Sequence, residues 1–184
     1  MKVIPELEDI ETVNRAQAGN VDAFGDLVEC YQSQIIRYCY RMTGDTEIAR
    51  DLAQDTFLRV YKSLSKTTPD LPFKTWLYRI ATNNVLQYRR KKRSLPSLRP
   101  MDNPGLEAAL QSVNTLNSDA EIQDILLRIP AKFRICMVLH FVDGFKYREI
   151  GQMLGISEDA VRMRVARGSE DFRKRFDTGG GDAK

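Results

Sequence analysis

The chain has 184 residues, 42% of them hydrophobic and 29% charged, and its net charge is +3. This length allows one medium domain or two small ones, and the composition is typical of a folded, soluble protein. The acidic start MKVIPELEDIE argues against a signal peptide, and the longest nearly apolar run, ICMVLHFV, is far shorter than the roughly 20 residues of a membrane-spanning helix. A cytoplasmic location is therefore expected.

Positive charge is concentrated in one short block of the chain. The net charge is −4 over residues 1–65, +8 over residues 66–100 and −1 over residues 101–184. Eight cations lie between Asp70 and Asp102 with no acidic residue among them. A solvated surface explains a cationic run by itself, but the whole block is more typical of a surface that binds a polyanion.

Helical periodicity dominates, and no segment alternates convincingly as a strand. Four helices are expected first, at about residues 6–18, 21–42, 45–65 and 74–94. Asn20 is a good N-cap for the second helix, and Gly44 is a good stop. Helical pattern resumes after residue 120. The expected fold class is therefore all-α.

Proline, serine and asparagine gather in the middle of the chain, which predicts a flexible linker. The glycine-rich end has nothing to bury and is expected to be disordered. The predicted organisation is two small helical domains, a linker and a tail, at residues 1–94, 121–176, 95–120 and 177–184.

The third expected helix has a distinct outer face. Its core side carries apolar residues at Ala49, Ala53, Phe57, Val60 and Leu64. Its outer side carries acids and amides around an apolar residue, at Asp51, Gln54, Asp55, Leu58 and Lys62. An exposed leucine ringed in this way is typical of a contact site for a protein partner, although single surface leucines are common.

The fourth expected helix separates a packed side from a donor-rich side. At 100° per residue the packed side holds Leu77, Ile80, Ala81, Val85 and Tyr88, with Trp76 at its edge. The opposite side carries hydrogen-bond donors and no carboxylate, at Thr75, Arg79, Thr82, Asn83, Arg89 and Arg90. Cations bind phosphates, amides reach bases, and aromatic rings stack on unpaired bases. Core packing explains Trp76 and Tyr78 about equally well.

The C-terminal half carries the pattern of a helix-turn-helix. Gly151 suits a close approach of two helices, Gly155 suits the turn, and Ser157 is placed to cap the second helix. A buried stripe is expected at Val161, Val165, Gly168, Phe172 and Phe176, which leaves Arg162, Met163, Arg164, Ala166 and Arg167 facing outward. Such a helix enters the major groove of DNA. A helical hairpin with a charged outer face is the less favoured alternative.

No catalytic or metal-ligating pattern is evident. Cys30, Cys39 and Cys136 form no CxxC motif, and the one histidine, His140, lies in an apolar run where packing is the expected role. No spacing brings a nucleophile and a base together. The sequence therefore argues against an enzyme and predicts neither metal nor cofactor, while a redox role for the cysteines stays open.

Three segments in order resemble the extracytoplasmic-function (ECF) class of bacterial RNA polymerase sigma factors: DLAQDTFLRVYKSL, PFKTWLYRIATNNVLQYRRKKR and IPAKFRICMVLHFVDGFKYREIGQMLGISEDAVRMRVARG. The resemblance covers about residues 10–94 and 121–176. It implies an alternative sigma factor that binds core RNA polymerase and directs promoter recognition and opening, with region 2 in the first domain and region 4 in the second. It also implies an anti-sigma factor as a partner, which in some cases holds such a protein at the membrane.

The resemblance assigns roles to three sets of residues. Asp51, Gln54, Asp55 and Leu58 match the segment that binds the clamp helices of the polymerase. The melted −10 element is matched by the loop at 66–73 and by Lys74, Trp76, Arg79, Asn83 and Asn84, with Arg89, Arg90, Lys91, Lys92 and Arg93 on phosphates. The duplex −35 element is matched by Lys146, Arg148, Arg162, Met163, Arg164 and Arg167. Asp159 and Met163 depart from the residues common in the family, so the −35 preference is not implied.

A second hypothesis is a stand-alone helix-turn-helix regulator whose C-terminal half binds duplex operator DNA and whose N-terminal half senses a ligand. Such a regulator has no use for the outer face at residues 51–58, or for amides and aromatic rings aimed at unpaired bases. It would usually bind as a dimer to a two-fold site, and the sequence shows no dimerisation heptads. Neither hypothesis involves a small-molecule substrate or membrane insertion.

Overall fold

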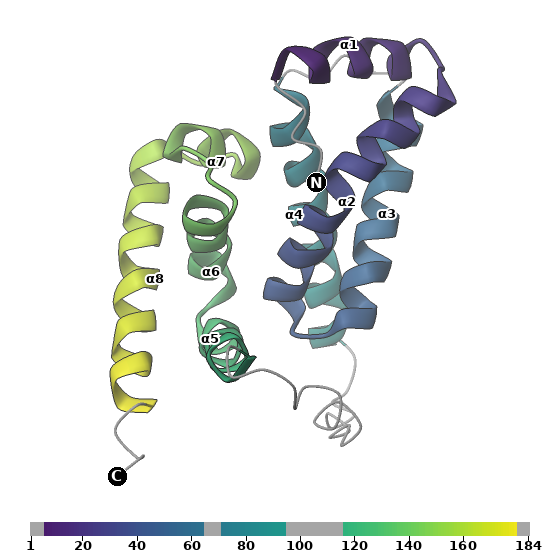
Figure 1. Cartoon of the computed structure of the whole chain (residues 1–184). Helices are drawn as coiled ribbons and strands as arrows, with labels where there is room; N and C mark the ends of the chain where they lie inside the picture. The colour runs from purple at the N-terminus through teal and green to yellow at the C-terminus, as the bar shows by residue number, and fades with distance from the viewer. Residues whose placement is uncertain (1–5, 65–70, 95–115, 180–184) are drawn as a thin grey trace.

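The computed structural model describes residues 6–64, 71–94 and 116–179, and these segments are helical and contain no strand (Figure 1). The N-terminal half consists of α1 (Glu6–Gln17), α2 (Val21–Thr43), α3 (Thr46–Leu64) and α4 (Phe73–Ser94). The C-terminal half consists of α5 (Leu116–Arg128), α6 (Ala131–Met137), the π-helix η2 (Val138–Val142), α7 (Tyr147–Leu154) and α8 (Glu158–Gly179). The all-α class is confirmed. No helix in the described segments is long and apolar enough to cross a membrane.

Local signals set the ends of α2 as the sequence predicts. The side chain of Asn20 accepts the Ala23 N–H at 2.9 Å and so caps the first turn. Gly44 takes a left-handed conformation with φ 75°, and its N–H donates to the carbonyl of Tyr40. The bounds of the first four helices agree with the prediction to within one residue at each end.

Two helices reach further than the sequence predicts. α5 begins at Leu116, inside the range expected to be linker, and α8 continues to Gly179. Ion pairs one turn apart support the late turns of α8, between Lys174 and Glu170 at 2.7 Å and between Arg175 and Asp171 at 2.9 Å. The remainder of the expected linker and tail, and residues 66–70 of the expected loop, lie outside the described residues.

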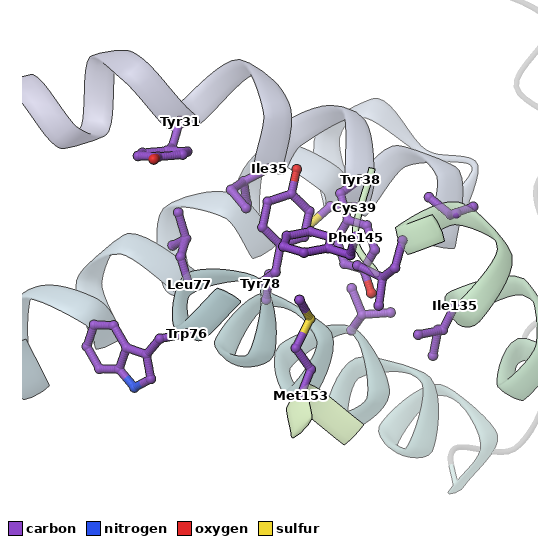
Figure 2. Close-up of a cluster of buried hydrophobic side chains, with 14 of the residues drawn as sticks. Tyr31, Ile35, Tyr38, Cys39, Trp76, Leu77, Tyr78, Ile135, Phe145 and Met153 are labelled. Carbon is purple, nitrogen blue, oxygen red and sulfur yellow. The ribbon is translucent and has the colours of Figure 1, made fainter. Parts of the chain in front are cut away.

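The two halves lie side by side and share one hydrophobic core (Figures 1 and 2). Tyr38 of α2 and Tyr78 of α4 pack edge to face at 5.4 Å between ring centroids. Phe145, which precedes α7, packs on Tyr78 at 4.8 Å and brings the C-terminal half into the same cluster. The helices of the two halves thus pack around one continuous core, and the division into two domains stays a prediction.

A buried arginine joins the halves at a second place. Arg134 of α6 is completely buried, and its guanidinium donates to the carbonyls of Leu126 and Met42, both at 3.0 Å. The Met42 carbonyl belongs to the last turn of α2, where helix carbonyls lack intrahelical donors. Burial lowers the pKa of Arg134 to about 10, with a smaller contribution from Arg89. One side chain therefore donates hydrogen bonds to the last turn of a helix in each half.

Candidate nucleic-acid and protein interfaces

The outer face of α3 has the geometry that the sequence predicts. The five core residues of the prediction are buried, at Ala49, Ala53, Phe57, Val60 and Leu64. Asp51, Gln54, Asp55 and Leu58 are exposed, and half of the Leu58 surface is open to solvent. Arg59 donates to the Asp55 carboxylate at 3.1 Å, which fixes one of the acids on this face.

Leu58 is not an isolated surface leucine, because it lies at the edge of an apolar groove of about 370 Å³ between α2 and α3. Phe24 and Val28 form the α2 side of the groove, and Tyr61 lies beside Phe24 with the rings edge to face at 5.0 Å. The sequence pattern of α3 could not reveal this groove, since four of its ten lining residues come from α2. Such a groove can accept the apolar side chains of a protein partner.

α4 is buried over a wider arc than its periodicity predicts. Thr75 and Thr82 are expected on the donor-rich outer side, but both are buried. Thr82 donates to the Tyr78 carbonyl at 2.7 Å and accepts the Tyr38 hydroxyl at 2.7 Å. The helical wheel fails here because α2 and α3 cover one side of α4 while the C-terminal half covers another.

Two residues predicted to lie near unpaired bases are part of the interior. Trp76 is buried (Figure 2). Its ring packs beside that of Phe73, with 6.1 Å between the ring centroids. Asn84 is only 2% exposed, and its amide donates to the Thr56 hydroxyl at 2.9 Å. Thr56 in turn donates to the Leu52 carbonyl. In this conformation both residues support the packing of α4, and Asn84 reaches the adjoining groove only with the small part of its surface that stays exposed.

The open side of α4 forms a polar groove with α3. The groove has a volume of about 580 Å³. Its walls carry cations, amides, one hydroxyl and one apolar side chain but no carboxylate: Arg59, Lys62, Ser63, Ile80, Asn83, Asn84, Gln87 and Arg90. Asn83, Arg90, Lys91 and Lys92 are exposed, whereas Arg79 is half-buried. A wall of this kind can hold phosphate groups and hydrogen-bond to bases.

The remaining predicted cations of α4 differ in their surroundings. Arg89 is half-buried and donates to the Met42 carbonyl at 3.4 Å. The side chain of Arg93 lies outside the described residues. Lys74 is turned toward the C-terminal half, where its ammonium lies 5.0 Å from the centre of the Phe145 ring and 3.4 Å from the Asp143 carbonyl. Of the predicted cations, Arg90, Lys91 and Lys92 thus lie at the open end of α4, whereas Lys74 lies at the end that contacts the C-terminal half.

Asp143 places a carboxylate in the contact between the halves. Its Oδ1 accepts the Tyr78 hydroxyl at 2.9 Å, and its Oδ2 is buried without a hydrogen-bond partner. Burial raises the pKa of Asp143 to about 6, although the Tyr78 hydrogen bond and the charges of Lys74, Arg41 and Arg37 act in the opposite direction. No sequence pattern points to this residue, because its hydrogen-bond partner Tyr78 lies 65 positions away and the neighbouring cations lie further still.

The helix-turn-helix forms as predicted. A Cβ at Gly151 would lie 2.8 Å from the Ile156 carbonyl, so the close approach of the helices requires glycine. Gly155 ends α7 with φ 65°, and the Ser157 hydroxyl accepts the Ala160 N–H at 3.2 Å at the start of α8. Local sequence signals were sufficient because each of these contacts joins residues close in the chain.

α8 presents an exposed basic surface. Arg162, Met163 and Arg167 are exposed, as are Lys146 and Arg148 at the start of α7. The Arg162 guanidinium lies 3.3 Å from the Glu158 carboxylate and 5.3 Å from the centre of the Tyr147 ring. Arg164 differs from the others, because it is half-buried and its charge acts to lower the pKa of the Cys136 thiol, against the larger effect of burial.

The prediction that Phe176 belongs to the buried stripe of α8 is wrong, because Phe176 is 48% exposed. It lies at an apolar groove of about 460 Å³, together with the exposed Phe141 and Val142, and Arg41 and Arg173 also line this groove. Phe141 and Val142 come from η2, where the Asp143 N–H donates to the Val138 carbonyl five residues earlier. A π-turn shifts the helical phase, which explains how part of an apolar run comes to face solvent.

The histidine and the buried cysteines have packing roles. His140 lies with Nδ1 2.9 Å from the Phe145 carbonyl and with its ring 4.4 Å from that of Tyr147. Burial raises the pKa of Cys136 and raises that of Cys39 to about 12, which disfavours the reactive thiolate. Within the described ranges, no group of three or more histidine, cysteine or acidic residues is placed to hold a metal ion.

Comparison with known proteins finds matches for both halves. Residues 27–95 match the family Sigma-70 region 2, and residues 119–171 match the family Sigma-70, region 4. The chain is 34% identical over 179 residues to the ECF RNA polymerase sigma factor SigW of Bacillus subtilis, across 89% of this chain and 94% of that relative. It is 33% identical over 156 residues to the ECF RNA polymerase sigma factor SigE of Mycolicibacterium smegmatis, across 82% of this chain and 60% of that relative.

The fold is also similar to a solved structure, that of CnrH in complex with the cytosolic domain of CnrY. The TM-score is 0.72 at 24% sequence identity, and the match covers 92% of this chain and 97% of CnrH. At this level of identity the likeness concerns the arrangement of the helices.

Proposed function

The chain belongs to the ECF family of RNA polymerase sigma factors and is an alternative sigma factor, and we propose that three of its surfaces divide the work of promoter recognition. In this proposal α3 binds core RNA polymerase, α4 contacts the melted −10 element, and α8 reads the duplex −35 element. The observation that carries the proposal is that one chain has three different surfaces. The outer face of α3 places acids around an apolar groove, the groove between α3 and α4 has no carboxylate, and α8 has arginines exposed on its outward face.

The polymerase-binding surface of the proposal is the outer face of α3 with the adjoining groove. Asp51, Gln54 and Asp55 would contact basic or donor groups of the partner, and Leu58 would enter an apolar contact beside Tyr61. Apolar anchors surrounded by polar residues commonly carry most of the affinity of such an interface. This arrangement supports a contact with a protein rather than with DNA, because acids repel phosphates.

The test is the affinity of the purified protein for core RNA polymerase. Leu58→Ala and Asp51→Lys should each weaken binding about tenfold or more, which corresponds to about 1.4 kcal/mol. Glu11→Lys makes the same change of charge on the exposed side of α1 and should leave the affinity unchanged. If the wild-type protein forms no complex with core polymerase, the proposal is wrong.

The −10 surface of the proposal is the open side of α4. Arg79 and Asn83 would approach bases, and Arg90, Lys91 and Lys92 would bind phosphates along the groove shared with α3. We assign Trp76 and Asn84 to the support of this surface, since both are buried. The −35 surface would use Arg162 and Arg167 on base edges, with Lys146, Arg148 and Arg164 nearby.

Phosphate contacts and base contacts can be separated by their dependence on salt and on sequence. Lys91→Ala with Lys92→Ala should weaken open-complex formation at every promoter, and should reduce the slope of log K against log salt by about 0.7–0.9 for each phosphate that is no longer neutralised. Arg162→Ala should act on one −35 base pair, with a loss of about 1–3 kcal/mol. The same sequence-independent effect for both variants would contradict the division of roles.

The proposal includes a regulatory partner and a place of action. We assign the protein to the cytoplasm, as a polymerase subunit without catalytic chemistry of its own. An anti-sigma factor is the proposed regulator, and its helix would bind the groove at Phe141 and Phe176, with acidic residues near Arg41 and Arg173. Phe176→Ala should weaken such a complex, whereas Ile10→Ala, which truncates an exposed apolar residue on α1, should not.

A further inference from the structure

Met163 is an exposed apolar side chain at an unusual place. Several of the large apolar residues exposed in the described segments line the two apolar grooves, at Leu58, Tyr61, Phe141, Val142 and Phe176. Met163 is 52% exposed and lines neither groove. It lies in the second turn of α8, where the second helix of a helix-turn-helix contacts the base edges.

Met163 is at the centre of the outward face of α8. The buried stripe of α8 contains Val161 and Val165, and Gly168 closes against Met137 of α6. At 100° per residue, Met163 lies roughly 180° from the middle of this stripe. A side chain in this position points toward whatever α8 binds.

The neighbours of Met163 leave it accessible. Arg162 is engaged to one side, with its guanidinium near the Glu158 carboxylate and over the Tyr147 ring. Asp159 and Arg167 lie one turn before and one turn after Met163 on the same face, and both are exposed. The apolar side chain of Met163 thus lies between the carboxylate of Asp159 and the guanidinium of Arg167, on the surface that would meet base edges.

The chemistry of the major groove selects a partner for such a patch. The base edges exposed there carry hydrogen-bond donors and acceptors, and only thymine adds an apolar group, its C5 methyl. A thioether placed over a polar edge would displace water without replacing its hydrogen bonds. Placed against the thymine methyl, the same side chain would bury apolar surface on both sides.

We propose that Met163 contacts the C5 methyl group of a thymine in the −35 element and makes that thymine a determinant of promoter choice. The inference rests on the proposed function of α8. It adds which base this chain selects at the position that faces Met163, where no arginine is available to hydrogen-bond a guanine. Arg162 and Arg167 would select neighbouring guanines, so the two kinds of contact should be separable.

The first experiment identifies the base. Core polymerase carrying the wild-type protein selects from a pool of duplexes randomised over the upstream promoter region, and the retained sequences are read. The wild-type selection should contain a thymine in the −35 element whose preference is lost with Met163→Ala and kept with Met163→Leu. Ile10→Ala serves as the matched control, since it truncates an exposed apolar residue on another helix, and it should reproduce the wild-type preference.

The second experiment removes the methyl group alone. Deoxyuridine replaces the selected thymine in a fixed duplex, which leaves the hydrogen-bonding edge of the base unchanged. The affinity of the wild-type holoenzyme should fall about fourfold, the factor that corresponds to about 0.8 kcal/mol for one methyl-sized group. Holoenzyme with Met163→Ala should bind the thymine and deoxyuridine duplexes equally.

The outcomes separate the inference from the function on which it rests. If no holoenzyme forms, or if holoenzyme selects no −35 sequence, the proposed function is wrong and the inference fails with it. If holoenzyme selects a −35 sequence but removal of each methyl leaves wild-type binding unchanged, Met163 does not read thymine. An equal loss in the wild type and in Met163→Ala overturns the inference as well.

Discussion

The two helices assigned to DNA, α4 and α8, differ in how much of their surface the rest of the molecule covers. On α4, Trp76, Tyr78 and Thr82 are all buried. On the outward turns of α8, Arg162 and Met163 are exposed. The same class of ligand is therefore proposed for α4, which is packed between its own half and the C-terminal half, and for α8, which lies at the edge of the molecule.

The difference arises because the C-terminal half covers the beginning of α4. Phe145 packs on Tyr78, and the Lys74 ammonium lies over the Phe145 ring. The other end of α4 remains open at Lys91 and Lys92. A DNA strand could follow the open end while the halves are packed, but the first turns of α4 would be shared with the other half.

Promoter geometry makes this contact a temporary one under the proposed function. Elements named −10 and −35 are roughly 25 base pairs apart, which is about 85 Å of B-form duplex. In the structure α4 is in direct contact with α7. Both elements cannot be bound while this contact persists, so the halves must separate on a promoter. The strength of the contact then sets how readily the protein opens.

Phe145→Ala tests the apolar part of this contact and should have the largest effect on stability. Phe145 is 4% exposed and lies against Tyr78. Removing a buried phenylalanine side chain should lower the free energy of unfolding by about 3–5 kcal/mol, because apolar burial is lost and a cavity remains. Urea denaturation followed by circular dichroism measures the loss.

Phe141→Ala is the matched control, four residues away on the same short segment. Phe141 is 62% exposed, so its truncation should change the free energy of unfolding by less than about 0.5 kcal/mol. If Phe145→Ala were as mild as Phe141→Ala, the halves would not be packed in solution and the contrast between α4 and α8 would disappear.

Arg134→Met tests the polar part of the contact and should have an intermediate effect. Methionine fills much of the same volume but removes the hydrogen bonds that Arg134 donates to the carbonyls of Met42 and Leu126, which keep only weaker contacts with Arg89 and the Ile129 N–H. Each lost hydrogen bond to the charged guanidinium is costly, while the guanidinium already bears a desolvation cost that its lowered pKa reflects. The net loss should be about 2 kcal/mol in the same urea experiment.

Arg128→Met provides the comparison for Arg134→Met. Arg128 is exposed and forms an ion pair with Asp124 at 2.7 Å, so its removal should cost less than about 1 kcal/mol. A larger loss for Arg128→Met than for Arg134→Met would show that the buried arginine does not hold the halves together.

The sequence predicts those parts of the molecule that depend on local contacts. On α3 a single buried side faces its neighbours, so the core positions and the exposed Asp51, Gln54, Asp55 and Leu58 follow from periodicity alone. The turn at Gly155 and the cap at Ser157 also involve only nearby residues. These features needed no knowledge of the tertiary fold.

Contacts between distant segments could not be predicted in this way. Thr82 faces the interior because several elements surround α4. Asp143 meets Tyr78 across 65 residues, and periodicity says nothing about such pairs. The prediction for Phe176 is wrong because the helical pattern of α8 does not reveal whether a neighbour covers its last turns. Tertiary packing, rather than weak local preference, accounts for each of these differences.

Asp143→Asn tests the titratable group of the contact, and its effect should depend on pH. The pKa of Asp143 is raised from 3.8 to about 6 by burial, against the opposing influence of Tyr78 and Lys74 from α4 and of Arg37 and Arg41 from α2. The folded state therefore holds this proton more tightly than the unfolded state does. The resulting stability is fully present below about pH 4 and is lost as the pH rises to about 6.

The variant should consequently be more stable than the wild type by up to about 3 kcal/mol at pH 7.5, the limit set by a pKa raised from 3.8 to about 6, and the difference should vanish near pH 4, since asparagine does not ionise. Thermal unfolding across this pH range measures the effect. A constant difference between Asp143→Asn and the wild type at every pH would mean that the Asp143 carboxyl is solvated, and hence that the beginning of α4 is as open as the outward face of α8.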